Sequence, residues 1–396
     1  MDISNCSTLR PILLLAAGAK GAVGSTLAVA IATMKENPET VLPSLTTGNM
    51  FPYLAAPETI QMAGWDTRSQ SLTACIQAQG VIPDYLWKPY AVDLDKIPLQ
   101  AAPSSALMLR EQVEHVMKDI QTLKDRHPDA RPVFVNLLPA GVQKDLADCR
   151  RISELFDKDS LQDFPDIAYA LAAIRSEVPV VNFSPNALEL PVIVNEALKH
   201  GIPISGRDGK TGQTYLKVVL ASAFKARNLF VDGWYSLNIL GNADGINLMN
   251  PEKAAGKLAH KTELLDEILG YRVGQKYGVS SHKVHIDYYP PRGDAKEAWD
   301  VIDFSGLFGL PMSIRLNLQG RDSILAAPLV IDLARWMAAL KMAGTSGAVA
   351  GLGFYFKKPV GENPPLTFQD QMQSLNKLEH QCNAKISSLS KDNQKD

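Results

Sequence analysis

The chain has 396 residues, of which 46% are hydrophobic and 21% are charged, and its formal net charge is −2. This is ordinary globular composition with room for two or three domains, and it excludes the basic footprint of a nucleic-acid-binding protein. Four widely spaced cysteines fit no metal site, so we expect reduced thiols in a cytoplasmic protein. The apolar run at 13–17 is too short for a signal peptide or a membrane span, so no membrane partner is expected.

The first predicted elements are a buried parallel strand at 11–17 and an apolar helix that ends near Met34, joined by a glycine-rich segment. This order is typical of a dinucleotide-binding fold, because glycine lets the backbone approach the pyrophosphate and the helix N-terminus faces its charge. A plain tight turn is the alternative. The residues expected to contact the cofactor are Gly18, Ala19, Lys20, Gly21, Ala22, Val23 and Gly24.

The next elements continue the alternation of strands and helices to about residue 205. We expect an amphipathic helix at 104–127, a buried strand at 132–138, a helix at 165–176 and a strand from 178. This alternation predicts a doubly wound α/β domain.

The segment 204–217 contains Gly-Lys-Thr, as phosphate loops do. The first glycine of a Walker A motif is replaced by Ile204, so we reject that motif. A hydroxyl beside a helix N-terminus can still hold a phosphate, and an ordinary capped helix is the alternative.

A strand is predicted at 235–240, followed by a loop of turn-formers at 241–245 and a helix from about Pro251. Three lysines then recur at helical spacing, so they share one face and repel by roughly 0.2–0.5 kcal/mol per pair. An anion such as phosphate across that face would offset the repulsion, and a solvated face is the alternative. The lysines are Lys253, Lys257 and Lys261.

The remaining pattern predicts an antiparallel strand at 283–291, another strand at 313–318, and a polar tail after about Leu375 in which a helix frays into disorder.

Five segments in this order resemble those of myo-inositol-1-phosphate synthases: 206–214, 237–248, 257 with 261, 293–300 and 322–333. The resemblance covers roughly residues 11–360, and the loops at 136–141 and 182–187 depart from it. It implies an NAD-binding Rossmann-like domain at 1–205 and a catalytic and oligomerisation α+β domain at 206–330. Residues 331–375 would return to the first domain, 376–396 would form the tail, and the protein would be a homotetramer.

The implied reaction is an NAD-dependent isomerisation of glucose 6-phosphate to inositol 3-phosphate. Hydride leaves C5, the C6 carbanion closes onto C1, and the hydride returns, so cations rather than a nucleophile are needed. The resemblance assigns catalytic roles to Lys257, Lys261, Lys357 (or Lys358), Asp244, Asp322 and Asp208. It assigns Asn182, Ser184 and Asp208 to the cofactor, and Thr211, Gly212, Gln213, Thr214, Asn238 and Asn242 to the substrate. Gly64-Trp65-Asp66 matches the family's Gly-Trp-Asp, which makes Asp66 a candidate ribose contact, with a turn-forming aspartate as the alternative.

A further departure from the family concerns a catalytic position. Asp287 stands where a catalytic lysine is expected, and Lys283 or His285, on the same strand face, is then expected to substitute in substrate binding. Asp287 alternatively binds a metal or another substrate, and a divalent or monovalent cation is a possible cofactor. Two other functions therefore stay open: a related cyclase acting on, for example, fructose 6-phosphate, and a non-catalytic NAD or sugar-phosphate sensor.

Overall fold

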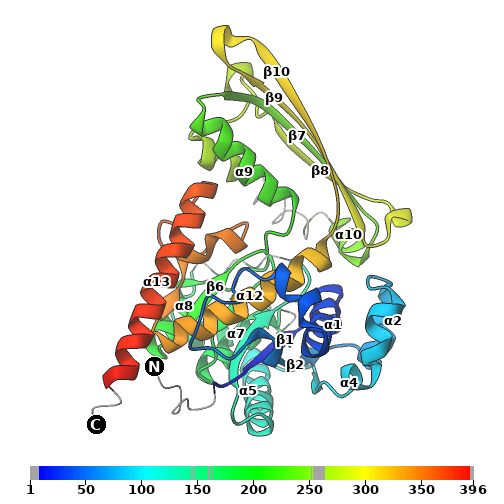
Figure 1. Ribbon diagram of the computed structural model, residues 1–396, viewed down its shortest axis with the longest axis vertical. Coiled ribbons are helices and arrows are strands. Elements are labelled where there is room, and N and C mark those ends of the chain that lie inside the picture. Colours follow the sequence, from blue (N-terminus) through cyan, green and yellow to red (C-terminus); the bar gives the residue numbers. More distant parts are fainter. Residues whose placement is uncertain are drawn as a thin grey trace.

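A seven-stranded, wholly parallel sheet forms the lower part of the molecule (Figure 1). The computed structural model describes residues 9–392 except 143, 145, 147, 159, 160, 163, 251 and 253–263. The strand order is β11-β6-β5-β4-β1-β2-β3, as in a doubly wound fold. The strands are β1 (Ile12–Ala17), β2 (Gln61–Asp66), β3 (Leu99–Ala101), β4 (Arg131–Asn136), β5 (Val180–Asn182), β6 (Pro203–Gly206) and β11 (Gly347–Ala348). The expected α/β class is confirmed.

Helices cover both faces of this sheet, which is why β1 is buried along its whole length. Alternate residues of β1 point to opposite faces: Leu14 packs with α1 (Ala22–Glu36) and α12 (Asp322–Met342), and Leu15 packs with α5 (Leu109–Arg126) and α7 (Asp166–Arg175). The remaining helices of this part are α2 (Leu72–Gln79), α3 (Asp84–Trp87), α4 (Ala91–Asp95), α6 (Ile152–Phe156) and α8 (Pro191–Lys199).

Helix α12 is the most apolar long helix of the core. By length and composition it could cross a membrane, with a mean hydropathy of 1.6, but 78% of that window is buried inside the protein. Helix α12 follows directly on strand β10 (Pro311–Arg321) of a second sheet and runs from there across the parallel-sheet part of the molecule (Figure 1).

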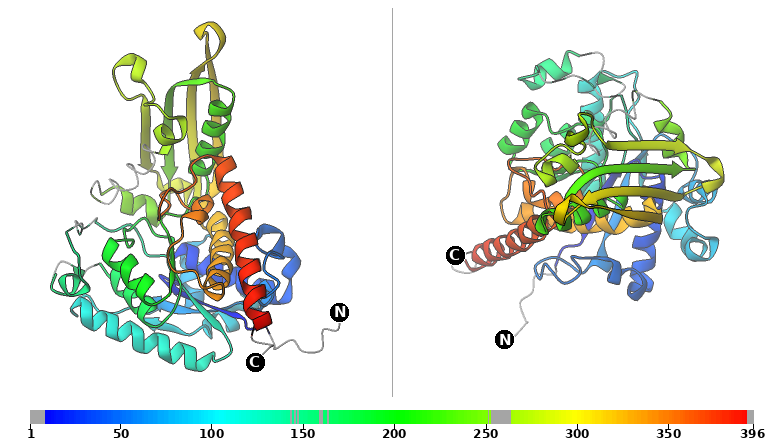
Figure 2. Two further views of the ribbon diagram at one scale, coloured as in Figure 1. Left: turned by 90° about the vertical axis from the view of Figure 1, so that its left-hand side faces the viewer. Right: turned by 90° about the horizontal axis from the view of Figure 1, so that it is seen from above.

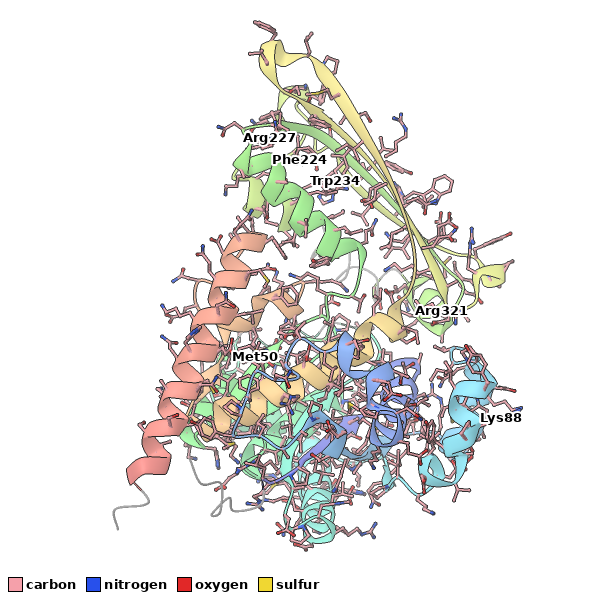
Figure 3. The ribbon with its side chains drawn as sticks, in the orientation of Figure 1. Met50, Lys88, Phe224, Arg227, Trp234 and Arg321 are labelled. Carbon is pink, nitrogen blue, oxygen red and sulfur yellow. The ribbon has the colours of Figure 1, made fainter. Side chains whose placement is uncertain are left out.

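A four-stranded sheet projects above the parallel sheet, in the order β10-β9-β7-β8 (Figure 2). Helix α9 (Gln213–Ala226) covers one face of it, and Phe224 and Trp234 fill the space between them (Figure 3). The strands are β7 (Phe230–Leu240), β8 (His282–Tyr288), β9 (Ala295–Ser305) and β10 (Pro311–Arg321).

The structure corrects three expectations. Strand β8 pairs with β7 in parallel, not antiparallel, because polar–apolar alternation reports one-sided burial and not strand direction. The predicted loop at 241–245 contains the start of helix α10 (Ala243–Leu248), whose N-cap Asn242 accepts a hydrogen bond from the Gly245 amide.

The third correction concerns the C-terminal segment. Helix α13 runs from Phe368 to Asp392, where a fraying tail was expected. Its apolar residues Leu375, Cys382 and Ile386 are buried against the parallel-sheet domain, and this packing holds a helix whose overall composition is polar.

Candidate active site

The glycine segment forms a tight turn between β1 and α1. Gly18 adopts a positive φ of 84°, and a side chain there would meet the Leu137 carbonyl oxygen at 3.0 Å. A Cβ on Gly24 would lie 2.4 Å from the Ala19 carbonyl oxygen, so only glycine permits this approach. Gly21 caps α1 without a side-chain hydrogen bond, which leaves first-turn amides facing the carboxyl edge of the sheet. This cradle fits a pyrophosphate.

The early amides of the turn bind the protein itself. Gly18 and Ala19 donate to the Trp65 carbonyl at 2.9 and 3.0 Å, and Lys20 donates from its backbone to the Asp66 carboxylate at 2.8 Å. The Asp66 side chain also accepts the Arg68 amide, so it joins the turn to the end of β2. Ala22, Val23 and Gly24 at the start of α1 therefore supply the amides best placed for an anion.

The Lys20 ammonium does not face the turn that Gly21 and Gly24 form. It donates to the carbonyl oxygens of Arg68 and Gln70 at 2.7 and 2.6 Å, so it reinforces the loop after β2. The structure thus gives Lys20 a place beside the expected ribose position and not beside the pyrophosphate cradle.

Asn182 and Ser184 lie at the carboxyl end of β5, inside a buried polar network. Asn182 accepts from Asn136 at 3.1 Å and donates to the Glu189 carboxylate at 2.8 Å. Burial raises the pKa of Glu189, although Arg207 and Asn182 oppose this shift. Asn182 therefore holds together the loops at the carboxyl end of β5, whereas the Ser184 carbonyl accepts the Asp208 amide at 3.0 Å.

A cavity is lined by residues of α9, α10, α12 and the four-stranded sheet. These elements meet above the carboxyl edge of the parallel sheet (Figure 1). We call this cavity the lysine pocket. Its volume is about 40 Å³, which holds a few water molecules, so an intact hexose phosphate requires its walls to move apart. It is lined by Thr211, Gly212, Gln213, Thr214, Asn238, Leu240, Asp244, Leu248, Ile286, Lys296, Asp322 and Lys357.

Asp322 organises one wall of the lysine pocket from the first turn of α12. It accepts from the Lys296 ammonium at 3.2 Å and from the Thr211 hydroxyl at 3.0 Å. Burial raises its pKa, but the positive charges of Lys296 and Lys357 outweigh burial and lower the pKa to about 2. Asp322 is therefore ionised at neutral pH and fixes Lys296 in the pocket.

Lys357 forms the opposite wall. Its ammonium donates to the Asp208 carboxylate at 2.7 Å, and its backbone amide donates to the Asp208 carbonyl at 2.7 Å. Both side chains are largely buried, at 15% and 5% exposed. Lys357 is the lysine that reaches the pocket, in preference to Lys358.

Two buried amides of the pocket keep one unsatisfied oxygen each within the described part of the chain. Gln213 donates to Asp300 at 2.8 Å, yet its Oε1 has no hydrogen-bond partner there. Asn238 donates to the His285 carbonyl, and its Oδ1 is likewise without a partner there. Unsatisfied buried acceptors are costly, and hydroxyl groups of a ligand would satisfy them.

Several predicted residues do not meet in the pocket. Lys283, His285 and Asp287 are exposed on β8, whereas Ile286 from the other face of that strand lines the pocket. The structure therefore does not bring these three polar side chains to the site. Asn242 caps α10 and donates to Asp294, so it shapes the wall without lining it.

Lys257 and Lys261 lie outside the described residues, so the structure does not place them. Lys296 is a pocket lysine that sequence reasoning missed. The sequence feature that could have indicated Lys296 is the family-like segment Gly293-Asp294-Ala295-Lys296. Asp294 of this segment accepts a hydrogen bond from the Ser323 hydroxyl, next to Asp322. Lys296, and no charged residue of β8, lines the pocket with Asp322 and Lys357.

The geometry gives two aspartate-held ammonium groups and a helix N-terminus around one cavity, together with two amide oxygens that have no hydrogen-bond partner among the described residues. Such a site stabilises negative charge that develops on oxygen and accepts hydrogen bonds from hydroxyls. Among the residues that the structure describes, no group of three or more His, Cys, Asp or Glu could hold a metal ion.

The comparisons with known proteins agree with this picture. The family model described as myo-inositol-1-phosphate synthase matches residues 212–323, the segment that contains most of the pocket. Inositol-3-phosphate synthase 1 of Bacteroides thetaiotaomicron is 38% identical over 258 residues, which are 63% of this chain and 60% of that protein. A probable inositol 3-phosphate synthase isozyme of Arabidopsis thaliana is 29% identical over 70% of this chain and 59% of its own length.

The solved structures match over a larger part of the chain. An inositol-3-phosphate synthase of Caenorhabditis elegans superposes with a TM-score of 0.81 at 20% identity, covering 96% of this chain and 86% of that one. A myo-inositol-1-phosphate synthase-related protein of Thermotoga maritima gives 0.76 at 20% identity, covering 94% and 98%. The resemblance to this family and its Rossmann-like fold is confirmed. The chain spans about 60% of the length of the curated relatives that it matches.

Proposed function

We propose that this protein is an NAD-dependent isomerase that cyclises D-glucose 6-phosphate to 1D-myo-inositol 3-phosphate without net oxidation. The observation that carries the proposal is the lysine pocket, in which Lys296 and Lys357 are held by separate aspartates beside the N-terminus of α9. The 38% identity to a protein named inositol-3-phosphate synthase supports the same reaction.

The cofactor would lie across the carboxyl edge of the parallel sheet. The amides of Ala22, Val23 and Gly24 would hold its pyrophosphate, and Asp66 lies at the ribose end of β2. Bound NAD would take a hydride from C5 of the open-chain sugar and return it after ring closure.

The substrate phosphate would sit against the N-terminus of α9. The backbone of Gly212 to Thr214 lines the lysine pocket there, and the Thr211 hydroxyl stands beside it. A helix of 14 residues offers unpaired amides and a positive dipole end to such a group. Free oxygens of Gln213 and Asn238 would accept hydroxyl hydrogens of the sugar.

The two lysines would act on oxygens that gain charge. When C5 is a ketone, the neighbouring C6 would lose a proton to the substrate's own phosphate and give an enolate, and C6 would then bond to the C1 aldehyde carbon. Lys296 and Lys357 would stabilise the enolate and the C1 alkoxide and return a proton to the latter, so atoms balance within one molecule. Lys257 and Lys261, which lie outside the described residues, are proposed to assist.

We also infer a cytoplasmic homotetramer, with a monovalent or divalent cation as an optional aid to phosphate binding. The exposed face of the four-stranded sheet carries Tyr235 and Trp299 at 46% and 50% exposure, which supports self-association. Cys75, Cys149 and Cys382 are buried free thiols, as expected in a reducing compartment. Light scattering of the purified protein tests the tetramer.

Phosphorus NMR tests the reaction. The protein is incubated with NAD and glucose 6-phosphate while absorbance follows NADH. We expect an inositol phosphate resonance to replace that of the substrate, with no NADH growing in proportion to product. Conversion of fructose 6-phosphate alone would favour the related-cyclase alternative. Ligand binding without any product would favour the sensor.

A further inference from the structure

A second, larger cavity opens at the amino edge of the parallel sheet, opposite the lysine pocket. Its volume is about 640 Å³, within the range of small-molecule sites. We call it the basic cavity, and Arg10, Lys124, Arg131 and Lys341 define it. These four cations come from four segments: the approach to β1, the end of α5, the start of β4 and the last turn of α12.

None of the four forms an ion pair within the described part of the chain. Arg10, Lys124 and Lys341 donate hydrogen bonds to backbone oxygens instead. Arg10 donates to the carbonyls of Pro128 and Asp129 at 2.6 and 3.0 Å. Lys124 donates to the Ser176 carbonyl at 3.4 Å, and Lys341 donates to the Glu177 carbonyl. Neutral carbonyls leave most of the positive charge uncompensated.

Arg131 is the least satisfied of these groups. Its Nε is buried and has no hydrogen-bond partner in the described part of the chain. Burial and the neighbouring Arg10 lower its pKa, and burial with Lys124 and Arg131 lowers that of Lys341 against the opposing pull of Glu177. The cations therefore repel one another, and the carboxylates of Glu177 and Asp125 at the wall are too few to neutralise them.

The other lining groups suggest the kind of anion. His127 adds no charge at neutral pH, because burial and Arg126 lower its pKa. Ala338, Met342 and three prolines give the cavity an apolar side. The volume exceeds that of one phosphate group, and guanidinium forks suit phosphate oxygens.

We propose that the basic cavity binds an organic polyphosphate of nucleotide size. The phosphates lie among Arg10, Lys124, Arg131 and Lys341, and the organic portion lies on the apolar side.

This site is distinct from the lysine pocket. Asp322 begins α12 in that pocket, and Lys341 and Met342 end the same helix in the basic cavity. At about 1.5 Å per residue, the helix separates the two sites by roughly 30 Å. The proposal therefore does not depend on the proposed cyclisation, and binding can be measured without turnover.

Isothermal titration of the NAD-saturated protein with magnesium-free ATP tests the proposal, since NAD keeps ATP from the glycine turn. The test variant is the double substitution Arg10→Gln with Lys124→Gln. The control is Lys118→Gln, an exposed lysine on α5 outside the cavity. Unchanged thermal unfolding and unchanged NAD affinity will show that each variant is folded.

We expect one ATP site of sub-millimolar Kd in the wild type and in the control, weakened at least about tenfold in the double variant because two charge-assisted contacts are lost. Added salt should weaken binding in the wild type. Absence of ATP binding at millimolar concentration, or equal affinity in the double variant and the control, would overturn the proposal.

Discussion

The two ends of helix α12 hold cations in opposite ways. In the lysine pocket, Lys296 and Lys357 each meet a carboxylate within 3.2 Å. In the basic cavity, Lys124 and Lys341 meet only carbonyls among the described residues. Lysines near one end of α12 are thus already paired with carboxylates, whereas the charge of the lysines near the other end is available to a ligand.

The difference matters for stability as well as for function. A buried ion pair offsets the desolvation of its charges only while both partners are present, and losing one leaves an uncompensated charge. Unpaired cations on a cavity wall repel one another, and removing one relieves that repulsion. Substitutions at the two ends of α12 should therefore have unlike effects.

The largest effect is expected from Lys296→Met. Removing a charge that stabilises a developing oxyanion should lower turnover of glucose 6-phosphate about 10²- to 10³-fold. The matched control is Lys283→Met, whose side chain is exposed on β8 away from the pocket. Steady-state product formation checks both, and near-wild-type turnover of the Lys296 variant would remove Lys296 from the reaction.

Next comes Lys357→Met, which removes the ammonium group that pairs with the Asp208 carboxylate, itself 5% exposed. We expect a loss of about 3 kcal/mol in the free energy of unfolding, the scale for breaking a buried pair. Urea titration measures it. Adding Asp208→Asn to the Lys357→Met variant should restore part of the lost free energy of unfolding. If it restores none, the broken Asp208–Lys357 pair is not the cause of the loss.

A smaller effect concerns pH and Asp322. Its folded pKa of about 2 lies below the unfolded value, so it contributes stability that is present above about pH 4 and is lost as pH falls toward 2. The Asp322 side chain is 32% exposed, so solvent screening reduces this to the order of 1 kcal/mol. Asp322→Asn should be less stable than wild type near pH 6, and the gap should shrink on acidification. A stability difference between the two proteins that stays constant with pH would contradict the lowered pKa of Asp322.

The smallest effect is expected from Lys124→Gln in the basic cavity. Because Lys124 has only a 3.4 Å hydrogen bond to a carbonyl, unfolding free energy without ligand should change by less than about 0.5 kcal/mol, or rise slightly. Urea titration beside the Lys357 variant gives the direct contrast. A loss of several kcal/mol would mean that the cavity cations are structural.

Sequence alone predicted the parts in which local pattern and tertiary structure agree. The apolar run of β1 and the glycines before α1 define strand, turn and helix within 25 residues, and packing on both faces agrees with that pattern. The Asp208–Lys357 pair could not be foreseen physically, because 149 residues separate its members and only the folded loops bring them together.

The β8 residues show how a local pattern can be misapplied. Val284 and Ile286 alternate with Lys283, His285 and Asp287, and on a half-buried strand the apolar set faces inward. The same alternation that predicted the strand therefore places its charged residues in solvent. The C-terminal helix was expected to fray because its sequence is mostly polar. Its few apolar residues instead pack against a part of the core that is distant in sequence, and α13 extends to Asp392.

Deuterium at C5 of glucose 6-phosphate tests the central claim most directly. Single-turnover product from the C5-labelled sugar and unlabelled NAD is analysed by mass spectrometry and NMR. If the lysine pocket holds one substrate through oxidation, closure and reduction, the deuterium returns to its carbon and the product keeps the label. Product that has lost the deuterium, or label that accumulates in free NADH, would contradict the account.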